Sequence, residues 1–215
     1  MGPNGSGKTT LIKILLGMVI PNSGDIQVLG KSILNSFTYR SAIGYMPQIG
    51  RYPENIRMGQ LIRMMQDMRP DCKELDLELL EDFGLNTMLD KAMHTLSGGT
   101  RQKVSAALAF MFGARILILD EPTAGLDPMA VEILKNKIIK ERANGKLILI
   151  TSHILSELDE LTDQVIYIHN GQVFFNDTID SLKDITGTSR FSSAIAKLME
   201  WSLKKKETLT ETCYA

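Results

Sequence analysis

The chain has 215 residues, of which 44% are hydrophobic, and its formal net charge at pH 7 is −1. This length and composition fit one large domain, or one domain with an inserted subdomain. The near-neutral charge gives no electrostatic argument for binding nucleic acid, so we expect no nucleic-acid partner. No apolar run is long enough to span a bilayer, and the two cysteines, Cys72 and Cys213, form no metal or redox motif. If the protein acts at a membrane, we expect another chain to cross it.

A glycine-rich loop, Gly2–Thr9, opens the chain with the pattern G-x-x-x-x-G-K-[ST], and the apolar pattern of Thr10–Leu16 predicts a helix behind it. Glycines let such a loop curl until its N–H groups point at an anion, and the helix N-terminus adds partial positive charge. Lys8 can reach the outer phosphates of a nucleoside triphosphate, and the hydroxyl of Thr9 can ligate Mg²⁺. The expected nucleotide-binding residues here are Gly2, Pro3, Asn4, Gly5, Ser6, Gly7, Lys8, Thr9 and Thr10.

Short apolar runs alternate with helical patterns along the rest of the chain. Runs typical of strands occur at Ile26–Leu29, Ile43–Met46, Ile116–Leu119 and Leu147–Ile150, and we expect the last two to be buried. Helical patterns occur near 101–112, 127–145, 155–161 and 190–204, and Asn170-Gly171 predicts a hairpin between two further short strands. Residues 57–86 show a helical pattern without clear strands, which favours an inserted helical subdomain. The alternation predicts an α/β fold with a mostly parallel sheet flanked by helices.

Two adjacent carboxylates, Asp120 and Glu121, follow the apolar run Ile116–Leu119. Phosphoryl transfer needs a metal on the β and γ phosphates and a base for the attacking water. We therefore expect Asp120 to hold Mg²⁺ through water and Glu121 to polarise the attacking water. The alternative is that Asp-Glu-Pro merely ends a strand, and the phosphate loop in the same chain disfavours it.

A second glycine-rich stretch, Leu96–Thr100, opens onto a helical pattern and predicts a second anion-binding nest at Ser97, Gly98 and Gly99. Two nests in one domain suggest a site assembled from two chains. Gln48 follows a predicted strand and can reach the metal or the water with its amide. His153 follows the run Leu147–Ile150 at the sheet edge where ligands bind, and it could contact the γ phosphate and orient the water. A purely structural histidine is the alternative.

These motifs, in this order, resemble the ATP-binding subunit of an ABC transporter, a P-loop NTPase. The matching segments are Gly2–Thr9 (Walker A), Gln48 (Q-loop), Leu96–Thr100 (signature), Ile116–Glu121 (Walker B and catalytic Glu), Ala124–Asp127 (D-loop) and His153 (switch His). Thr100 stands where Glu or Gln is more usual in the family. The resemblance covers about residues 2–175.

The resemblance implies that two such domains, here in a homodimer, sandwich two ATP molecules head to tail, each with Mg²⁺. It implies catalytic roles for Lys8, Gln48, Glu121 and His153, and metal contacts from Thr9, Gln48 and Asp120. Ser97, Gly98 and Gly99 would act on the nucleotide of the partner domain. The Gln48 loop would pass motion to an integral membrane permease, which would hold the subunit at the cytoplasmic face of the cell membrane.

The resemblance also predicts the domain limits: an ABC ATPase domain at 1–175 with its helical subdomain at about 50–112, and a C-terminal helical tail at 176–215 with a disordered end. Members of the family normally carry a strand and an adenine-stacking aromatic before the phosphate loop. We therefore expect an N-terminally truncated version of the domain, with weak ATP binding. A non-catalytic fragment is the alternative. Soluble ABC ATPases of translation or DNA repair are a further alternative, but the chain shows neither tandem domains nor a long coiled coil.

A narrower likeness rests on Gly44–Ile49, Tyr52–Asn55 and Leu96–Ser105, which look like the ATPase of the copper-linked system that matures nitrous oxide reductase. Methionines could bind copper through thioether sulfur. The helical spacing of Met64, Met65 and Met68 instead favours core packing, so we assign them no metal.

Overall fold

The computed structural model describes residues 1–211, with side-chain environments for residues 1–203. The predicted disordered end and Cys213 fall outside the described residues. The chain divides into two compact units, which are described separately: Ser23–Thr151 is one, and Met1–Asn22 together with the chain from Ser152 onward is the other.

A parallel three-stranded sheet forms the centre of the unit Ser23–Thr151. It has the order β3-β4-β5, in which β3 is Ile43–Met46, β4 is Ile116–Asp120 and β5 is Leu147–Thr151. The middle strand, β4, is buried along its whole length, as its continuous apolar sequence predicts. The register sets Asp120 opposite Thr151 at the carboxyl ends of β4 and β5.

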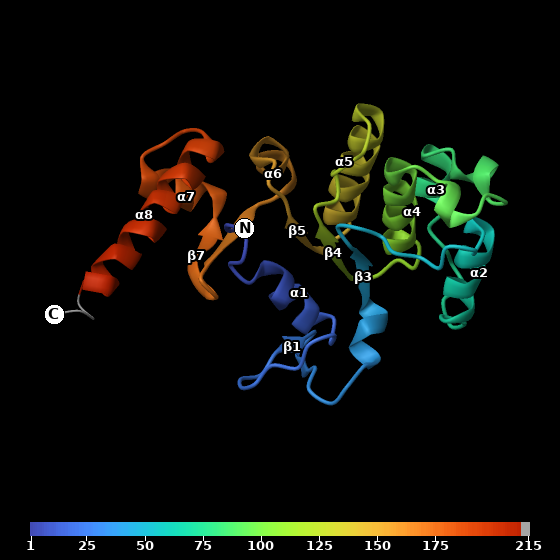
Figure 1. The fold of residues 1–215 in the computed structure, drawn as a ribbon, viewed down its shortest axis with the longest axis horizontal. Coiled ribbons are helices and arrows are strands. Elements are labelled where there is room, and N and C mark those ends of the chain that lie inside the picture. Colours follow the sequence, from blue (N-terminus) through green and yellow to red (C-terminus); the bar gives the residue numbers. More distant parts are fainter. Residues whose placement is uncertain (212–215) are drawn as a thin grey trace. The chain divides into compact units, whose positions relative to one another are not determined.

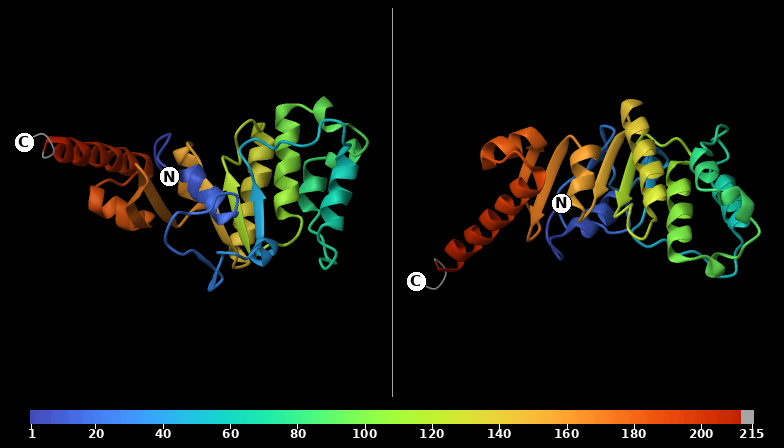
Figure 2. Two further views of the ribbon diagram at one scale, coloured as in Figure 1. Left: turned by 60° about the horizontal axis from the view of Figure 1, so that its bottom comes forward. Right: turned by 90° about the horizontal axis from the view of Figure 1, so that it is seen from above.

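Helices α4 (Gly98–Phe110) and α5 (Pro128–Ala143) lie along one face of this sheet (Figures 1 and 2). Asp127 caps α5 by accepting a hydrogen bond from the amide of Ala130, and Pro128 occupies the first turn. The smaller elements of the unit are β1 (Gln27–Val28), β2 (Lys31–Ser32), η1 (Thr38–Ala42), α2 (Met58–Asp67), α3 (Glu78–Asp82), η2 (Leu85–Met88) and η3 (Met93–Thr95).

The other unit begins with the phosphate loop and α1 (Lys8–Leu15). It continues with α6 (Leu155–Leu161), the hairpin of β6 (Gln164–His169) and β7 (Gln172–Thr178), then α7 (Ile179–Thr186) and α8 (Phe191–Glu211). Leu182, Ala194 and Leu198 are almost fully buried between α7 and α8. This apolar contact holds the two C-terminal helices together.

The α/β fold with a parallel sheet is confirmed, but several local predictions are wrong. Strand β5 is not a buried central strand, because it pairs only with β4 among the described strands and Leu147 is 64% exposed. Met64 and Met68 are exposed rather than core residues, because Met58, Leu61 and Ile62 take the buried positions of α2. The sequence analysis also missed β2 and α7. The predicted domain limits stay a prediction.

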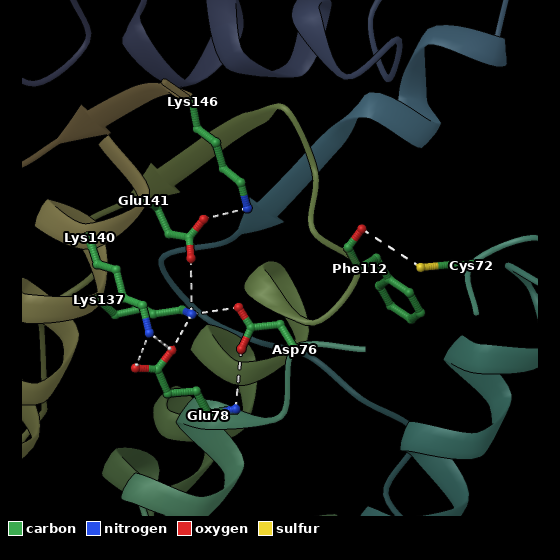
Figure 3. Close-up of polar contacts among 8 residues, drawn as sticks. All are labelled: Cys72, Asp76, Glu78, Phe112, Lys137, Lys140, Glu141 and Lys146. Atoms are coloured by element: carbon green, nitrogen blue, oxygen red, sulfur yellow. Dashed lines mark hydrogen bonds and ion pairs between the residues drawn. The ribbon is translucent and has the colours of Figure 1, made fainter. Parts of the chain in front are cut away.

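A cluster of charged side chains joins α5 to the start of α3 (Figure 3). The side chain of Lys137 is 3% exposed, and its ammonium lies 2.5 Å from Asp76 Oδ2, 2.6 Å from Glu78 Oε2 and 3.0 Å from Glu141 Oε1. Lys140 also binds Glu78, at 2.8 Å, and Lys146 pairs with Glu141. One buried cation thus links two helices with three carboxylates, an arrangement in which loss of the cation leaves unpaired charge.

We predict that Lys137→Met lowers the free energy of unfolding at pH 7 by about 3 kcal/mol, because it leaves the carboxylates without their shared partner. Hydrogen bonds from Lys137 and Lys140 lower the pKa of Glu78. Burial alone would raise the pKa of Glu141, but hydrogen bonds from Lys146 and Lys137 outweigh it and lower that pKa. Lowered pKa values stabilise the folded state above the ordinary glutamate pKa of about 4.3, and this stabilisation is lost as the pH falls below it.

The difference in unfolding free energy between wild type and Lys137→Met should therefore shrink from pH 6 to pH 3, measured by urea denaturation. Lys135 on the same helix provides a control, because its ion pair with Glu132 lies outside the cluster and Lys135→Met leaves the cluster intact. A difference that stays constant over this pH range would contradict the view that Lys137 stabilises the fold through the charged forms of these carboxylates.

Gly44 on β3 marks a close contact between the sheet and α4. A Cβ at this position would lie 2.1 Å from the carbonyl oxygen of Ala109 and 2.9 Å from Cδ2 of Leu117. We predict that Gly44→Ala destabilises the protein by about 1–3 kcal/mol, because α4 must move away from the sheet. Gly98→Ala is the matched control, since its Cβ would meet nothing within 4 Å. Thermal unfolding of both variants measures the difference, and equal midpoints would contradict the prediction.

Candidate functional site

The phosphate loop leads directly into α1, whose N-cap residue Gly7 has a φ of 106°. A left-handed backbone at this position favours glycine. The Lys8 ammonium donates hydrogen bonds to the carbonyl oxygens of Gly2, at 2.6 Å, and Pro3, at 2.9 Å. The amide of Ser6 donates to the same Pro3 carbonyl at 3.2 Å. Lys8 therefore spans its own loop and places a positive charge at the helix N-terminus.

The loop has the features that a phosphate group requires. Ser6 is 2% exposed, and its hydroxyl is buried with no hydrogen-bond partner among the described residues. An unsatisfied buried hydroxyl is costly, so its place beside a helix N-terminus and an ammonium fits a group that accepts hydrogen bonds. The residues present therefore fit a bound phosphate. Thr9 and Thr10 are exposed in the first turn of α1.

The two predicted carboxylates lie where β4 ends, in the other unit. Asp120 is 8% exposed and accepts a hydrogen bond from the hydroxyl of Thr151, its partner across the sheet. The next amide, that of Glu121, donates to the carbonyl oxygen of Thr151 at 3.0 Å and lies 3.2 Å from its hydroxyl oxygen. Thr151 thus fixes both residues. The pKa of Tyr45 on β3 is raised by burial and by the charge of Asp120.

Glu121 has a φ of 51°, a left-handed backbone that is uncommon for a glutamate. Such conformations cost free energy and persist only where the surroundings enforce them. Here the two contacts with Thr151 and a hydrogen bond from the Ala124 amide to the Glu121 carbonyl, at 3.1 Å, enforce it. The turn therefore bends the chain away from the direction of the strand at this half-buried residue.

The second nest lies at the start of α4. Ser97 is the N-cap, and its hydroxyl oxygen accepts a hydrogen bond from the amide of Thr100 at 3.1 Å. Arg101 donates to the carbonyl oxygen of Leu96 at 2.6 Å. Ser97 and Gly98 are exposed, so the helix N-terminus that they form is open to an anion.

This nest is packed against the loop before α5. A Cβ on Gly99 would lie 2.8 Å from the carbonyl oxygen of Gly125, so the close approach requires glycine. Lys103 on α4 lies 2.6 Å from Asp127, the cap of α5, and its hydrogen bond lowers the pKa of Asp127. The signature and D-loop segments therefore form one fixed corner of this unit.

Gln48 and His153 are both exposed, and each lies just beyond a strand. Gln48 follows β3 by two residues, and His153 follows β5 by two residues. The hydroxyl of Ser152 accepts a hydrogen bond from the amide of Ile154 at 3.0 Å, which fixes the turn that carries His153. Both placements agree with the strand ends predicted from the sequence.

The predicted site residues divide between the two units. The phosphate loop and His153 belong to one, and Gln48, Ser97–Gly99, Asp120 and Glu121 belong to the other. The hydroxyl, amide and carboxylate oxygens of Thr9, Gln48 and Asp120 are ligand types that suit Mg²⁺. Over the described part of the chain, no cluster of three or more His, Cys, Asp or Glu side chains could hold a metal ion by itself. Joint coordination by these three residues stays a prediction.

Sequence reasoning missed Thr151, which fixes both carboxylates. Thr151 could have been found only from the register of the two parallel strands Ile116–Asp120 and Leu147–Thr151. A single sequence does not reveal that register. The described helices include none that is long and apolar enough to cross a membrane.

Comparison with known proteins agrees with these features. The sequence model described as ABC transporter matches residues 1–124. The ABC transporter ATP-binding protein YxlF of Bacillus subtilis is 30% identical over 100% of this chain, which covers 72% of YxlF. The Nod factor export ATP-binding protein I of Rhizobium sp. (strain N33) is 33% identical over 80% of this chain, which covers 58% of that protein.

A much longer relative is the retinal-specific phospholipid-transporting ATPase ABCA4 of Homo sapiens, 31% identical over 96% of this chain, which covers 9% of that protein. A solved structure described as the ATP binding subunit of an ABC transporter has a TM-score of 0.85 and 28% identity, with 92% of this chain and 85% of that chain covered. The chain therefore belongs to the ABC transporter family: it is an ATP-binding subunit of the class that couples ATP hydrolysis to transport.

Proposed function

We propose that this chain binds ATP with Mg²⁺ on Gly2–Thr10, hydrolyses it in a homodimer, and drives an integral membrane permease with the resulting motion. The observation that carries the proposal is the phosphate loop, with the Lys8 ammonium across it and the unpartnered hydroxyl of Ser6 within it. The fixed carboxylates at the end of β4 supply the second requirement, a metal ligand beside a base.

Each residue has a role that follows from its chemistry. Lys8 neutralises charge on the β and γ phosphates, and the loop amides bind the same oxygens. Thr9, Gln48 and Asp120 would hold Mg²⁺, which when bound supplies charge neutralisation at the phosphate oxygens. Glu121 accepts a proton from the water that attacks the γ phosphorus, and ADP leaves. His153 orients the γ phosphate and the water.

The exposed nest of Ser97, Gly98 and Gly99 would contact the nucleotide held by a second copy. A helix N-terminus open to an anion has little to bind within its own unit, whereas a head-to-tail pair would bring it a γ phosphate. Gln48, exposed at the end of β3, would pass the change of state to the permease, and the permease would hold the subunit at the cytoplasmic face of the membrane.

The narrower assignment to the copper-linked system that matures nitrous oxide reductase stays a proposal on sequence likeness alone. The relatives named above include an exporter of Nod factor and a phospholipid-transporting ATPase by their names, so the family covers diverse cargo. The cargo is set by the permease. The second candidate function, a non-catalytic fragment, is opposed by the fixed Glu121, since an inactive chain would not need to retain a strained carboxylate.

We predict that Glu121→Gln lowers the ATPase kcat at least about 100-fold and leaves ATP affinity within a few-fold of wild type, because the amide removes the base but no phosphate contact. Lys8→Ala should weaken ATP binding about 10- to 100-fold, because it removes a charge-assisted contact. Steady-state phosphate release and nucleotide titration measure the two effects.

Glu132→Gln on the outer side of α5 is the matched control, since it changes the same chemical group outside the proposed site. Wild-type protein that binds no ATP would contradict the proposed function. A wild type that binds ATP without hydrolysing it would favour the non-catalytic alternative.

We also predict that Glu121→Gln forms a dimer when ATP is added, because a bound but uncleaved nucleotide holds both nests together. Ser97→Arg in that background should prevent the dimer and leave the ATP affinity of the monomer unchanged. Sedimentation velocity with and without ATP measures the association. A dimer that forms equally well with Arg at this exposed position would contradict the role of the second nest.

A further inference from the structure

The turn of the β6–β7 hairpin makes a direct contact with the phosphate loop, within one unit of the chain. The amide of Gly171 donates a hydrogen bond to the carbonyl oxygen of Ser6 at 2.9 Å. The loop also runs along β6, because the amide of Ile168 donates to the carbonyl oxygen of Met1 at 2.8 Å and the Met1 ammonium donates to the Ile166 carbonyl at 2.5 Å. Figure 1 shows the N-terminal segment beside this hairpin.

Both ends of the loop lie against the hairpin, and at Gly2 the fit is close. A Cβ on Gly2 would lie 2.0 Å from the carbonyl oxygen of Ile168, so no side chain can be accommodated there without movement. A Cβ on Gly7 would lie 3.7 Å from the Cα of Gly171, which is an ordinary van der Waals distance.

The hydrogen bond from Gly171 has a defined effect on the loop. A peptide unit is planar and trans, so the carbonyl of Ser6 and the amide of Gly7 point in opposite directions. Because Gly171 holds the Ser6 carbonyl, the Gly7 N–H points away from the hairpin. In a phosphate loop the direction of such an amide decides whether it can bind an anion.

The sequence of the turn explains why this donor is available. His169 and Gln172 are paired across the hairpin, so Asn170 and Gly171 are its two central residues. Both have a positive φ, 49° and 75°, as a type I′ turn requires. The amide of Gly171 lies outside the strand ladder and is used by the phosphate loop instead.

The hairpin is itself braced by the C-terminal helix of the same unit. Tyr167 on β6 is 1% exposed, and its hydroxyl lies 3.5 Å from that of Ser202 on α8, which is 3% exposed. The Phe174 ring packs edge-on against Tyr167, with centroids 6.3 Å apart. The strands that carry the turn therefore have packed support from α8 and from each other.

We propose that the Asn170–Gly171 turn is a positioning element for nucleotide binding: its amide holds the Ser6–Gly7 peptide in the orientation that binds phosphate. This rests on the proposed function, since it assigns the support of the same loop. The turn does not touch the reacting atoms. It therefore sets the affinity for ATP and the KM, and leaves kcat at saturating ATP unchanged.

The test exchanges the turn type without changing its length. Types I′ and II′ differ by a flip of the central peptide, and type II′ has glycine first and a residue with negative φ second. The double variant Asn170→Gly/Gly171→Ser favours type II′ and turns the amide of residue 171 away from Ser6. On the present backbone a Cβ at residue 171 would meet nothing within 4 Å, so the position has room for the serine. The control Asn170→Gly keeps glycine at 171 and remains compatible with type I′.

We expect the double variant to bind ATP about 5- to 10-fold more weakly, the worth of roughly one hydrogen bond, and to raise KM by a similar factor. The control should bind ATP like wild type, and both variants should keep the wild-type kcat. Without nucleotide the control should unfold at the wild-type midpoint, and the double variant should stay folded with a midpoint only a few degrees lower, because it loses one hydrogen bond. If the wild type binds ATP and the folded double variant binds it with the same affinity, this inference is overturned and the proposed function stands. Wild type that binds no ATP would overturn the proposed function.

A second measurement leaves the turn unchanged, so it does not depend on whether the double variant folds. Because coupling is reciprocal, a turn that favours ATP binding is itself stabilised when ATP binds. Amide exchange of Gly171, followed by NMR on the Glu121→Gln protein, should slow when MgATP is added. The amide of Gly187, which caps α7 in the same unit by donating to Asp184, should not change. Equal exchange of Gly171 with and without bound ATP would overturn the proposal.

Discussion

A polyanion can be held by backbone amides only if the backbone is already fixed, and this constraint governs the phosphate loop. Its glycines supply a conformation that other residues resist, but the same freedom would let the loop collapse when empty. Three contacts prevent this: the Lys8 ammonium on the Gly2 and Pro3 carbonyls, the Met1 pairing with β6, and the Gly171 amide on Ser6. Each engages carbonyl groups of the loop, and the Gly171 contact leaves the Gly7 amide pointing away from the hairpin.

The two carboxylate residues at the end of β4 also have a fixed backbone, but here strand pairing and Thr151 fix it. Asp120 and Glu121 are adjacent in the chain but lie in different surroundings, because Asp120 is buried at the end of β4 and Glu121 is half-buried in the turn that follows. Thr151 separates them by accepting the Glu121 amide with its carbonyl and donating its hydroxyl to Asp120. The left-handed φ of Glu121 is the conformational cost of that separation, and the strand pairing of β4 with β5 compensates for it.

The parts of the fold that the sequence predicts are those with local causes. The Asp127-Pro128 start of α5, the Asn170-Gly171 turn and the continuous apolar run of β4 each specify their structure within a few residues. The exposure of Leu147 and Met68 could not be predicted, because it depends on which neighbours a strand or helix receives in space. The contribution of Thr151 escaped for the same reason, since it follows from the register of two strands about thirty residues apart in the chain.

The corner between α4 and α5 has a consequence for how a second subunit could act on this one. Gly99 contacts Gly125, and Lys103 pairs with Asp127, so the exposed nest and the loop before α5 cannot move independently. That loop is in turn joined to Glu121 through the hydrogen bond from the Ala124 amide to the Glu121 backbone carbonyl. A force applied at Ser97 therefore reaches the strained peptide of Glu121 through two packed contacts in the same unit. A strained conformation persists only while its surroundings enforce it, so we expect Glu121 to respond to a change at the nest without any contact of its own with a second copy.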